Sequence, residues 1–134
     1  MFILFLLAVS FYIANGFRTQ SAGVRGILMC GDLPLANTKV KLWDEDATDM
    51  DDLLQEGTTN AHGYFELSGH TSEITTINPI LKIYHDCNDG IMETFEIPQE
   101  YVSNGEDVEK FFDIGTVNMQ IIFPDQSRDC IHRY

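Results

Sequence analysis

The densest group of reactive side chains is an acidic segment, residues 44–52, with six carboxylates in nine positions. Calcium binds proteins through several carboxylate and carbonyl oxygens carried on turn-rich loops. The candidate ligands here are Asp44, Asp46, Asp49, Asp51 and Asp52. The segment lacks the mid-loop glycine and the closing glutamate of an EF-hand. The alternative is therefore a solvated acidic loop that holds no ion.

A second kind of chemistry is suggested at the end of a β-prone run, where His85 and Asp86 precede Cys87. A histidine beside a cysteine can activate the thiol as a nucleophile, which would make the protein a hydrolase. The alternative is a cluster of polar residues at a strand end. The chain has no G-x-S-x-G, no Gly-rich phosphate loop and no zinc-type spacing of histidines or cysteines. We therefore expect a protein that is not an enzyme.

The N-terminus predicts secretion. Residues 2–13 are uncharged and almost all apolar, and small residues follow at positions 14–16. About a dozen apolar residues are too few to cross a bilayer core of roughly 30 Å, but they suit the central region of a signal peptide. We expect residues 1–16 to be a signal peptide cleaved near Gly16 or Phe17. The alternative is a buried first strand or an uncleaved anchor.

The charge of the chain limits its partners. Residues 17–134 carry the whole net charge of −13, and the sequence pI is about 4.4. Nucleic-acid binding requires clustered lysine and arginine, so we expect no nucleic-acid partner. Direct attraction to an anionic membrane is disfavoured for the same reason. No second apolar stretch is long enough for the membrane, so residues 17–134 should form one extracellular domain without a transmembrane segment.

Short β-prone runs separated by glycine, asparagine, aspartate and proline turns recur along the chain. The runs are residues 24–30, 38–43, 53–59, 64–67, 80–85, 91–97 and 111–123. This spacing is typical of an all-β sandwich or a small barrel. In residues 38–43, Val40 and Leu42 share one face while Lys39 and Lys41 share the other, which indicates a strand with one solvated face. A change of phase near Gly115 predicts a bulge.

Several blocks, in order along the chain, resemble the nematode transthyretin-like family. They are residues 24–31, 40–46, 51–54, 63–69, 81–87, 112–118 and 128–130. The resemblance implies a secreted, transthyretin/prealbumin-like fold, a Greek-key β-sandwich of seven to eight strands, with no assigned enzymatic chemistry. Hydroxyisourate hydrolases share that fold and use His and Arg residues with a C-terminal Y-R-G-S. This chain lacks that tetrapeptide and has no histidine in its first expected strand, so that reaction is not expected.

Three cysteines allow at most one internal disulfide, and the count alone leaves every pairing open. The family usually has a fourth cysteine and a basic segment shortly after H-D-C, and this chain has neither. The resemblance therefore implies that Cys87 is an unpaired thiol. In the family's fold the first and last strands run parallel and adjacent, which implies a Cys30–Cys130 disulfide. The missing segment falls at the start of an edge strand, so a dimer through edge strands or Cys87 remains an open alternative to a monomer.

These observations predict a secreted binding or bridging protein for a small apolar ligand or a cell-surface partner. One alternative is a calcium-dependent surface or lipid adaptor that uses the acidic segment. The other alternative is the hydrolase built on His85 and Cys87. Calcium is the only cofactor for which the sequence offers candidate ligands.

Overall fold

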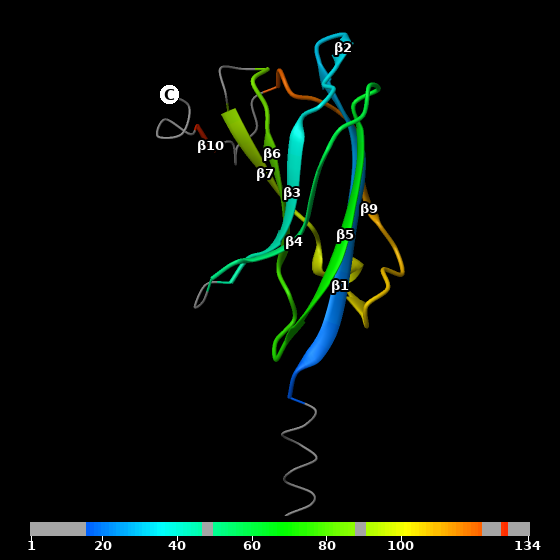
Figure 1. The fold of residues 1–134 in the computed structure, drawn as a ribbon, viewed down its shortest axis with the longest axis vertical. Helices are drawn as coiled ribbons and strands as arrows, with labels where there is room; N and C mark the ends of the chain where they lie inside the picture. The colour runs from blue at the N-terminus through cyan, green and yellow to red at the C-terminus, as the bar shows by residue number, and fades with distance from the viewer. Residues whose placement is uncertain (1–15, 47–49, 88–90, 122–126, 129–134) are drawn as a thin grey trace, which may run out of the picture.

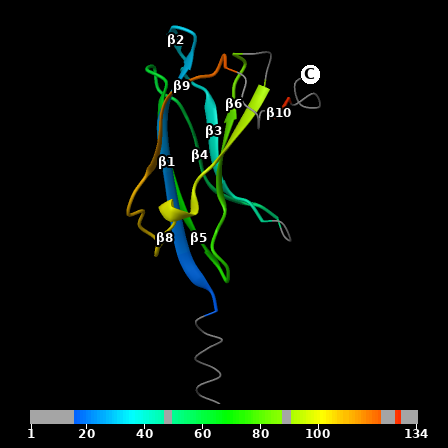
Figure 2. The ribbon, with the colours of Figure 1, turned by 180° about the vertical axis from the view of Figure 1, so that it is seen from behind.

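A computed structural model describes residues 16–46, 50–87, 91–121 and 127–128. In these ranges the chain forms two β-sheets that pack face to face (Figures 1 and 2), and its one helical turn is the 3-10 helix η1 (Gln99–Tyr101). The first sheet contains β1 (Arg18–Cys30), β2 (Leu33–Pro34), β5 (Tyr64–Glu73), β8 (Ser103–Asn104) and β9 (Phe112–Asn118). The second sheet contains β3 (Lys39–Asp44), β4 (Asp52–Thr58), β6 (Pro79–Tyr84), β7 (Ile91–Glu96) and β10 (Ser127–Arg128).

The prediction of an all-β sandwich with seven to eight strands is confirmed. Seven of the described strands have six residues or more, and three are two-residue strands. Two strands are longer than the sequence pattern indicated, because β1 and β5 pair antiparallel from Arg18 opposite Glu73 to Ile27 opposite Tyr64. The added residues are polar or small, and it is this pairing that holds them in extended conformation.

β1 organises the first sheet. It pairs antiparallel with β2, β5 and β8 and parallel with β9. The parallel ladder is irregular, since Arg25 lies opposite Asp113 but Ile27 lies opposite Thr116. Gly115 has a φ of +74° at this irregularity, a conformation that glycine adopts without steric cost. The bulge expected near Gly115 is therefore confirmed.

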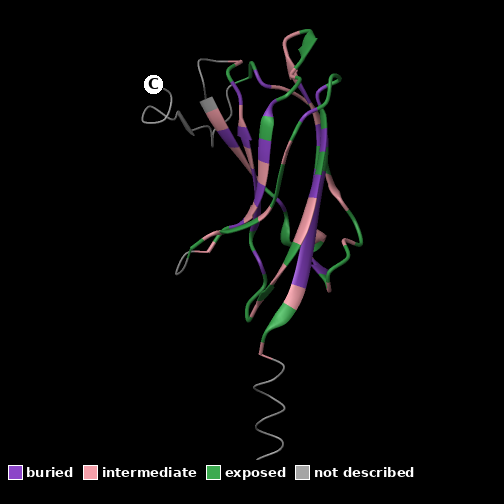
Figure 3. Ribbon diagram, viewed as in Figure 1, coloured by how far each residue is buried: buried purple, intermediate pink, exposed green. Residues whose placement is uncertain are grey.

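The core lies between the two sheets, and buried residues alternate with less buried ones along strands such as β3 (Figure 3). Its buried members are Val24, Leu28, Val40, Leu42, Phe65, Leu67, Leu81, Ile83, Ile97 and Met119. Val40 and Leu42 face inward as the alternation predicted, while Lys39 and Lys41 face away from the core. Burial of these side chains supplies most of the favourable free energy that holds the sheets together.

A disulfide connects the two sheets at one end of the sandwich. Cys30 ends β1, Cys87 follows β6, and the two are bonded with their Cα atoms 5.8 Å apart. The predicted Cys30–Cys130 pairing and the predicted unpaired thiol at Cys87 are therefore wrong. β9 does run parallel to β1, but it ends with Asn118 opposite Met29, and Cys130 lies beyond it, outside the described residues.

The edge of the second sheet also differs from expectation. Ile91 and Met92, at the start of β7, pair with β10, so this part of β7 is covered. A dimer through Cys87 loses its basis because the sulfur of Cys87 is already bonded. Of the expected signal peptide, residues 1–15 lie outside the described residues. Within the described part of the chain, no helix has the length and apolarity needed to span a membrane.

Candidate functional site

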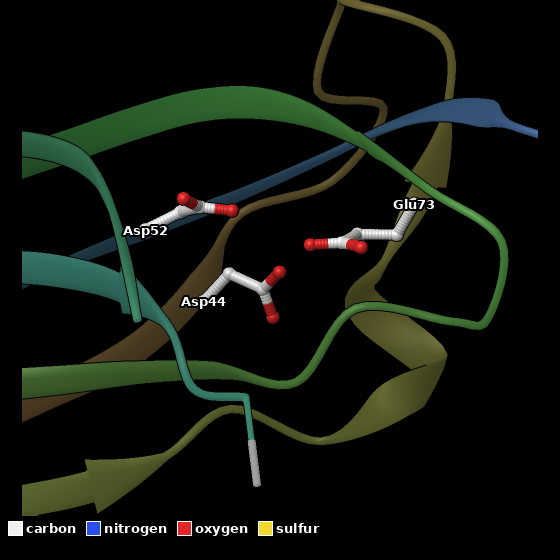
Figure 4. Close-up of side chains that lie close together, drawn as sticks. All are labelled: Asp44, Asp52 and Glu73. Carbon is white, nitrogen blue, oxygen red and sulfur yellow. The ribbon is translucent and has the colours of Figure 1, made fainter. Parts of the chain in front are cut away.

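Three carboxylates meet at the end of the sandwich opposite the disulfide. Asp44 ends β3, Asp52 begins β4, and Glu73 ends β5 in the other sheet. One oxygen of each residue lies within 4.8 Å of the others, and Figure 4 shows the three side chains pointing toward one another. We call these residues the carboxylate cluster. The cluster therefore places carboxylates from both sheets, which repel one another when ionised, close together.

Local strand pairing explains how the carboxylate cluster assembles. Asp44 and Asp52 are direct partners in the β3–β4 hairpin. Asp44 follows the inward phase of Val40 and Leu42, so its side chain turns toward the other sheet and is 3% exposed. One of its oxygens, Oδ1, accepts a hydrogen bond from the backbone N–H of Asn78 at 2.9 Å.

Burial and crowding change the protonation of the cluster. Burial raises the pKa of Asp44, and the charges of Asp52 and Asp46 act in the same direction, while hydrogen bonds from Asn78 and Glu73 oppose them. The pKa of Glu73 is raised by desolvation, by its hydrogen bond with Asp44 and by the nearby aspartates. The hydrogen bond between Asp44 and Glu73 lowers the pKa of Asp44 and raises that of Glu73, which favours Glu73 as the donor in this bond. A hard cation coordinated by the same oxygens would neutralise the repulsion in another way.

The structure brings together two of the five predicted calcium ligands, Asp44 and Asp52. Asp51 instead accepts a hydrogen bond at Oδ1 from the backbone N–H of Asp46, at 3.0 Å. Asp49 lies outside the described residues. Glu73 was missed, because nothing in its own sequence neighbourhood shows that the end of β5 lies beside the β3–β4 hairpin.

His85 contacts the backbone of Cys87, not its sulfur. His85 Nδ1 accepts the backbone N–H of Cys87 at 3.1 Å, and His85 Nε2 lies 3.3 Å from Glu93 Oε1. The side chains of His85 and Glu93 are 0% and 2% exposed. Because the sulfur of Cys87 is bonded to Cys30, it has no thiolate to act as a nucleophile. The hydrolase hypothesis for His85 and Cys87 is therefore wrong.

His85 should make the stability of the protein depend on pH. Burial lowers its pKa, with the charge of Asp86 acting in opposition, and protonation of Nδ1 would replace an acceptor by a donor facing the Cys87 N–H. Below the ordinary pKa of about 6.5 the unfolded chain binds a proton that the folded chain resists, so stability falls as pH falls. The expected slope approaches about 1.4 kcal/mol per pH unit.

Urea unfolding between pH 5 and 8, followed by Trp43 fluorescence, measures this dependence. His85→Gln should flatten the slope, because glutamine does not titrate and can still accept one hydrogen bond and donate another. His70→Gln, at an exposed position in β5, is the matched control and should keep the slope of the wild type. Equal slopes for wild type and His85→Gln would refute this role of His85.

Comparison with known proteins gives consistent results. The model of the Transthyretin-like family matches residues 25–100. Transthyretin-like protein 33 of Caenorhabditis elegans is 62% identical over 121 residues, an alignment that covers 86% of this chain and 85% of that protein. Transthyretin-like protein 5 of the same organism is 46% identical over 138 residues, covering 98% and 99% of the two chains.

Proposed function

The chain belongs to the transthyretin-like family, and on that premise we propose that it is a secreted, non-enzymatic protein that binds a cell-surface partner. The apolar run at residues 2–13 supports secretion, with residues 1–16 removed before the protein acts. The disulfide between Cys30 and Cys87 supports the same conclusion, because such bonds persist in oxidising compartments.

Packing between the sheets favours a partner on the outside of the molecule. Leu28, Leu42 and Ile83, from three different strands, are each 0% exposed within the core. A small apolar ligand held between the sheets would have to displace such side chains, and close-packed protein interiors resist such displacement. Of the two partner classes expected from the sequence, the cell-surface partner is therefore the better supported.

The single observation that carries the proposal is the composition of the outer face of β3 and β6. The only tryptophan of the chain and three of its four lysines lie there. We call this surface the lysine–aromatic face: Lys39, Lys41, Trp43, Lys82 and Tyr84. In a chain of net charge −13, this concentration of lysines offers a local surface for an anionic partner.

Expression in a secreting cell line tests the proposal. The protein should appear in the medium with an N-terminus near Gly16 or Phe17, read by mass spectrometry. The labelled protein should bind intact cells, and Lys41→Glu/Lys82→Glu should abolish most of that binding. Lys110→Glu is the matched control, since Lys110 is exposed and packs against Tyr101, away from this face. Retention inside the cell, or binding that both variants leave intact, would contradict the proposal.

A calcium-dependent adaptor is the second candidate, and the carboxylate cluster is the observation that favours it. Its three side chains come from both sheets, so a bound calcium ion would bridge them. Glu73 takes part where the sequence had suggested Asp46, Asp49 and Asp51. Burial and, after it, the repulsion from neighbouring carboxylates raise the pKa of Asp44 and of Glu73, and a cation here would offset the cost of both for the ionised side chains.

Calcium should then raise the thermal stability of the protein, through Asp44. With calcium at about ten times its dissociation constant, the expected gain is about 1.4 kcal/mol. Asp44→Asn should remove this gain, yet be no less stable than wild type without calcium, because it loses a repelling charge and keeps an acceptor for the Asn78 N–H. Asp32→Asn, at an exposed turn, is the control and should respond like wild type. Melting temperatures measured in calcium and in chelator test this prediction. If calcium raised the melting temperature of Asp44→Asn as much as that of wild type, this site would be excluded.

A further inference from the structure

The lysine–aromatic face places positive charges directly against one another. β3 and β6 pair antiparallel with Lys41 opposite Lys82 and Lys39 opposite Tyr84. Like charges in such a pair destabilise a sheet unless something compensates them. Figure 1 shows β3 and β6 lying side by side in the middle of the second sheet, so this pair is not at an edge.

Aromatic rings hold these ammonium groups in place. Lys41 Nζ lies 5.3 Å from the centre of the Tyr84 ring and 5.9 Å from that of the Trp43 ring, and Lys82 Nζ lies 5.6 Å from the Trp43 ring. Cation–π contacts of this kind orient a lysine but leave its charge in place. The ion pairs found among the described residues are Arg25–Asp113 and His85–Glu93, and neither includes a lysine of this face.

Trp43 carries a hydrogen-bond donor, its buried indole N–H, that has no partner among the described residues. Leaving a buried donor unsatisfied lowers the stability of the folded protein. The face therefore places two adjacent lysine charges beside two aromatic rings, and of these lysines only Lys41 has a carboxylate, Glu56, opposite it on the neighbouring strand β4. A ligand rich in anionic oxygens would pair with the ammonium groups.

The surroundings of the face select a narrow ligand. Trp43 is followed directly by Asp44 and the rest of the acidic segment. Across the neighbouring strands, Glu56 lies opposite Lys41 and Glu96 lies opposite Ile80. A broad anionic surface such as a membrane would meet these carboxylates together with the lysines and be repelled. A slender chain can lie across β3 and β6 alone.

From this geometry we infer that the lysine–aromatic face binds a sulfated glycan chain. This inference rests on the proposed extracellular binding function and specifies the class of its ligand. The C–H groups of the sugar rings contact Trp43 and Tyr84 beside the lysines that lie over their rings. Sulfate groups, which stay ionised at every physiological pH, pair with the ammonium groups of Lys41 and Lys82, and Lys39 extends the charged row along β3. Binding is electrostatic in part and weakens as salt is added.

A heparin hexasaccharide titrated into the purified protein tests the inference, with Trp43 fluorescence as the readout. Trp43 is the only tryptophan, so a change in its emission reports on this face. Lys41→Gln/Lys82→Gln should weaken binding about tenfold, as expected for the loss of two partly exposed charge pairs. Lys110→Gln should stay within about twofold of wild type. The same hexasaccharide without its sulfates should bind much more weakly.

Three results would overturn the inference. They are an unchanged Trp43 emission, equal binding of the sulfated and desulfated hexasaccharide, and a loss in Lys110→Gln as large as in the double variant. Phosphatidylglycerol vesicles and a poly-glutamate peptide serve as competing probes. If either binds more tightly than the hexasaccharide, and its binding depends on Lys41 and Lys82, the face belongs to that class of partner instead. If the hexasaccharide fails while cell binding still depends on Lys41 and Lys82, the ligand class alone is wrong. If cell binding is absent, the proposed function itself fails.

Discussion

Replacing Cys30 and Cys87 together by alanine should lower the free energy of unfolding by about 4 kcal/mol. The bond joins residues separated by 57 positions, and removing it frees the unfolded chain to adopt conformations that the loop excludes. It also releases the ends of β1 and β6, which lie in different sheets. A loss of this size is a large fraction of the stability of an ordinary domain.

Urea unfolding of the oxidised and the reduced wild type gives the comparison for this variant. Reduction should produce nearly the same loss as the double substitution, and Cys130→Ala should leave the disulfide and most of the stability in place. Alkylation before reduction should modify Cys130 and spare Cys87. A destabilisation in Cys130→Ala equal to that of the double variant, with label on Cys87, would restore the pairing that the sequence had implied.

Gly63→Ala should destabilise the protein by about 3 kcal/mol or more, since it combines backbone strain with a steric clash. Gly63 has a φ of +79°, and a Cβ atom there would lie 2.3 Å from the carbonyl oxygen of Leu28. Two backbone hydrogen bonds hold Leu28 in this position. Leu28 donates its N–H to the Gly63 oxygen at 2.8 Å, and its oxygen accepts the N–H of Leu35 at 2.9 Å. The alanine would push β1 and β5 apart at their junction.

Gly105→Ala separates the two causes. Gly105 also has a positive φ, +92°, but an added Cβ would meet no atom within 4 Å. Its substitution should cost only the backbone strain, about 1–2 kcal/mol. Thermal or urea unfolding of both variants measures the difference. If Gly63→Ala were no worse than Gly105→Ala, β1 would have room to move at Leu28.

The sequence was informative where structure depends on near neighbours. The alternation around Val40 and Lys41 correctly assigned the inner and outer faces of β3, because side chains alternate along any strand. The phase change at Gly115 correctly located a bulge. Two of the three members of the carboxylate cluster were also foreseeable, since Asp44 and Asp52 belong to one acidic segment between neighbouring strands and lie opposite each other.

Features that depend on pairing between distant strands were missed. Glu73 reaches the cluster because β5 pairs with the whole length of β1, and no local pattern encodes that register. Which cysteine bonds to Cys30 depends on where the chain leaves β6 in one sheet and β9 in the other, because those end points decide whether Cys87 or Cys130 lies near Cys30. The resemblance gave the correct neighbour for β1, namely β9, but an incorrect end point for it. Spatial contact could not be derived from the order of the cysteines.

The parallel pairing of β1 and β9 also affects the timing of folding. Arg25 and Asp113 form an ion pair, although 88 residues separate them. A chain emerging from the ribosome must therefore release the residues up to Asp113 before one side of β1 can pair with β9. Until then that side of β1 exposes unpaired backbone groups, which invites association with other chains. Formation of this contact should therefore be a late event, and the nascent protein is most vulnerable to aggregation just before it.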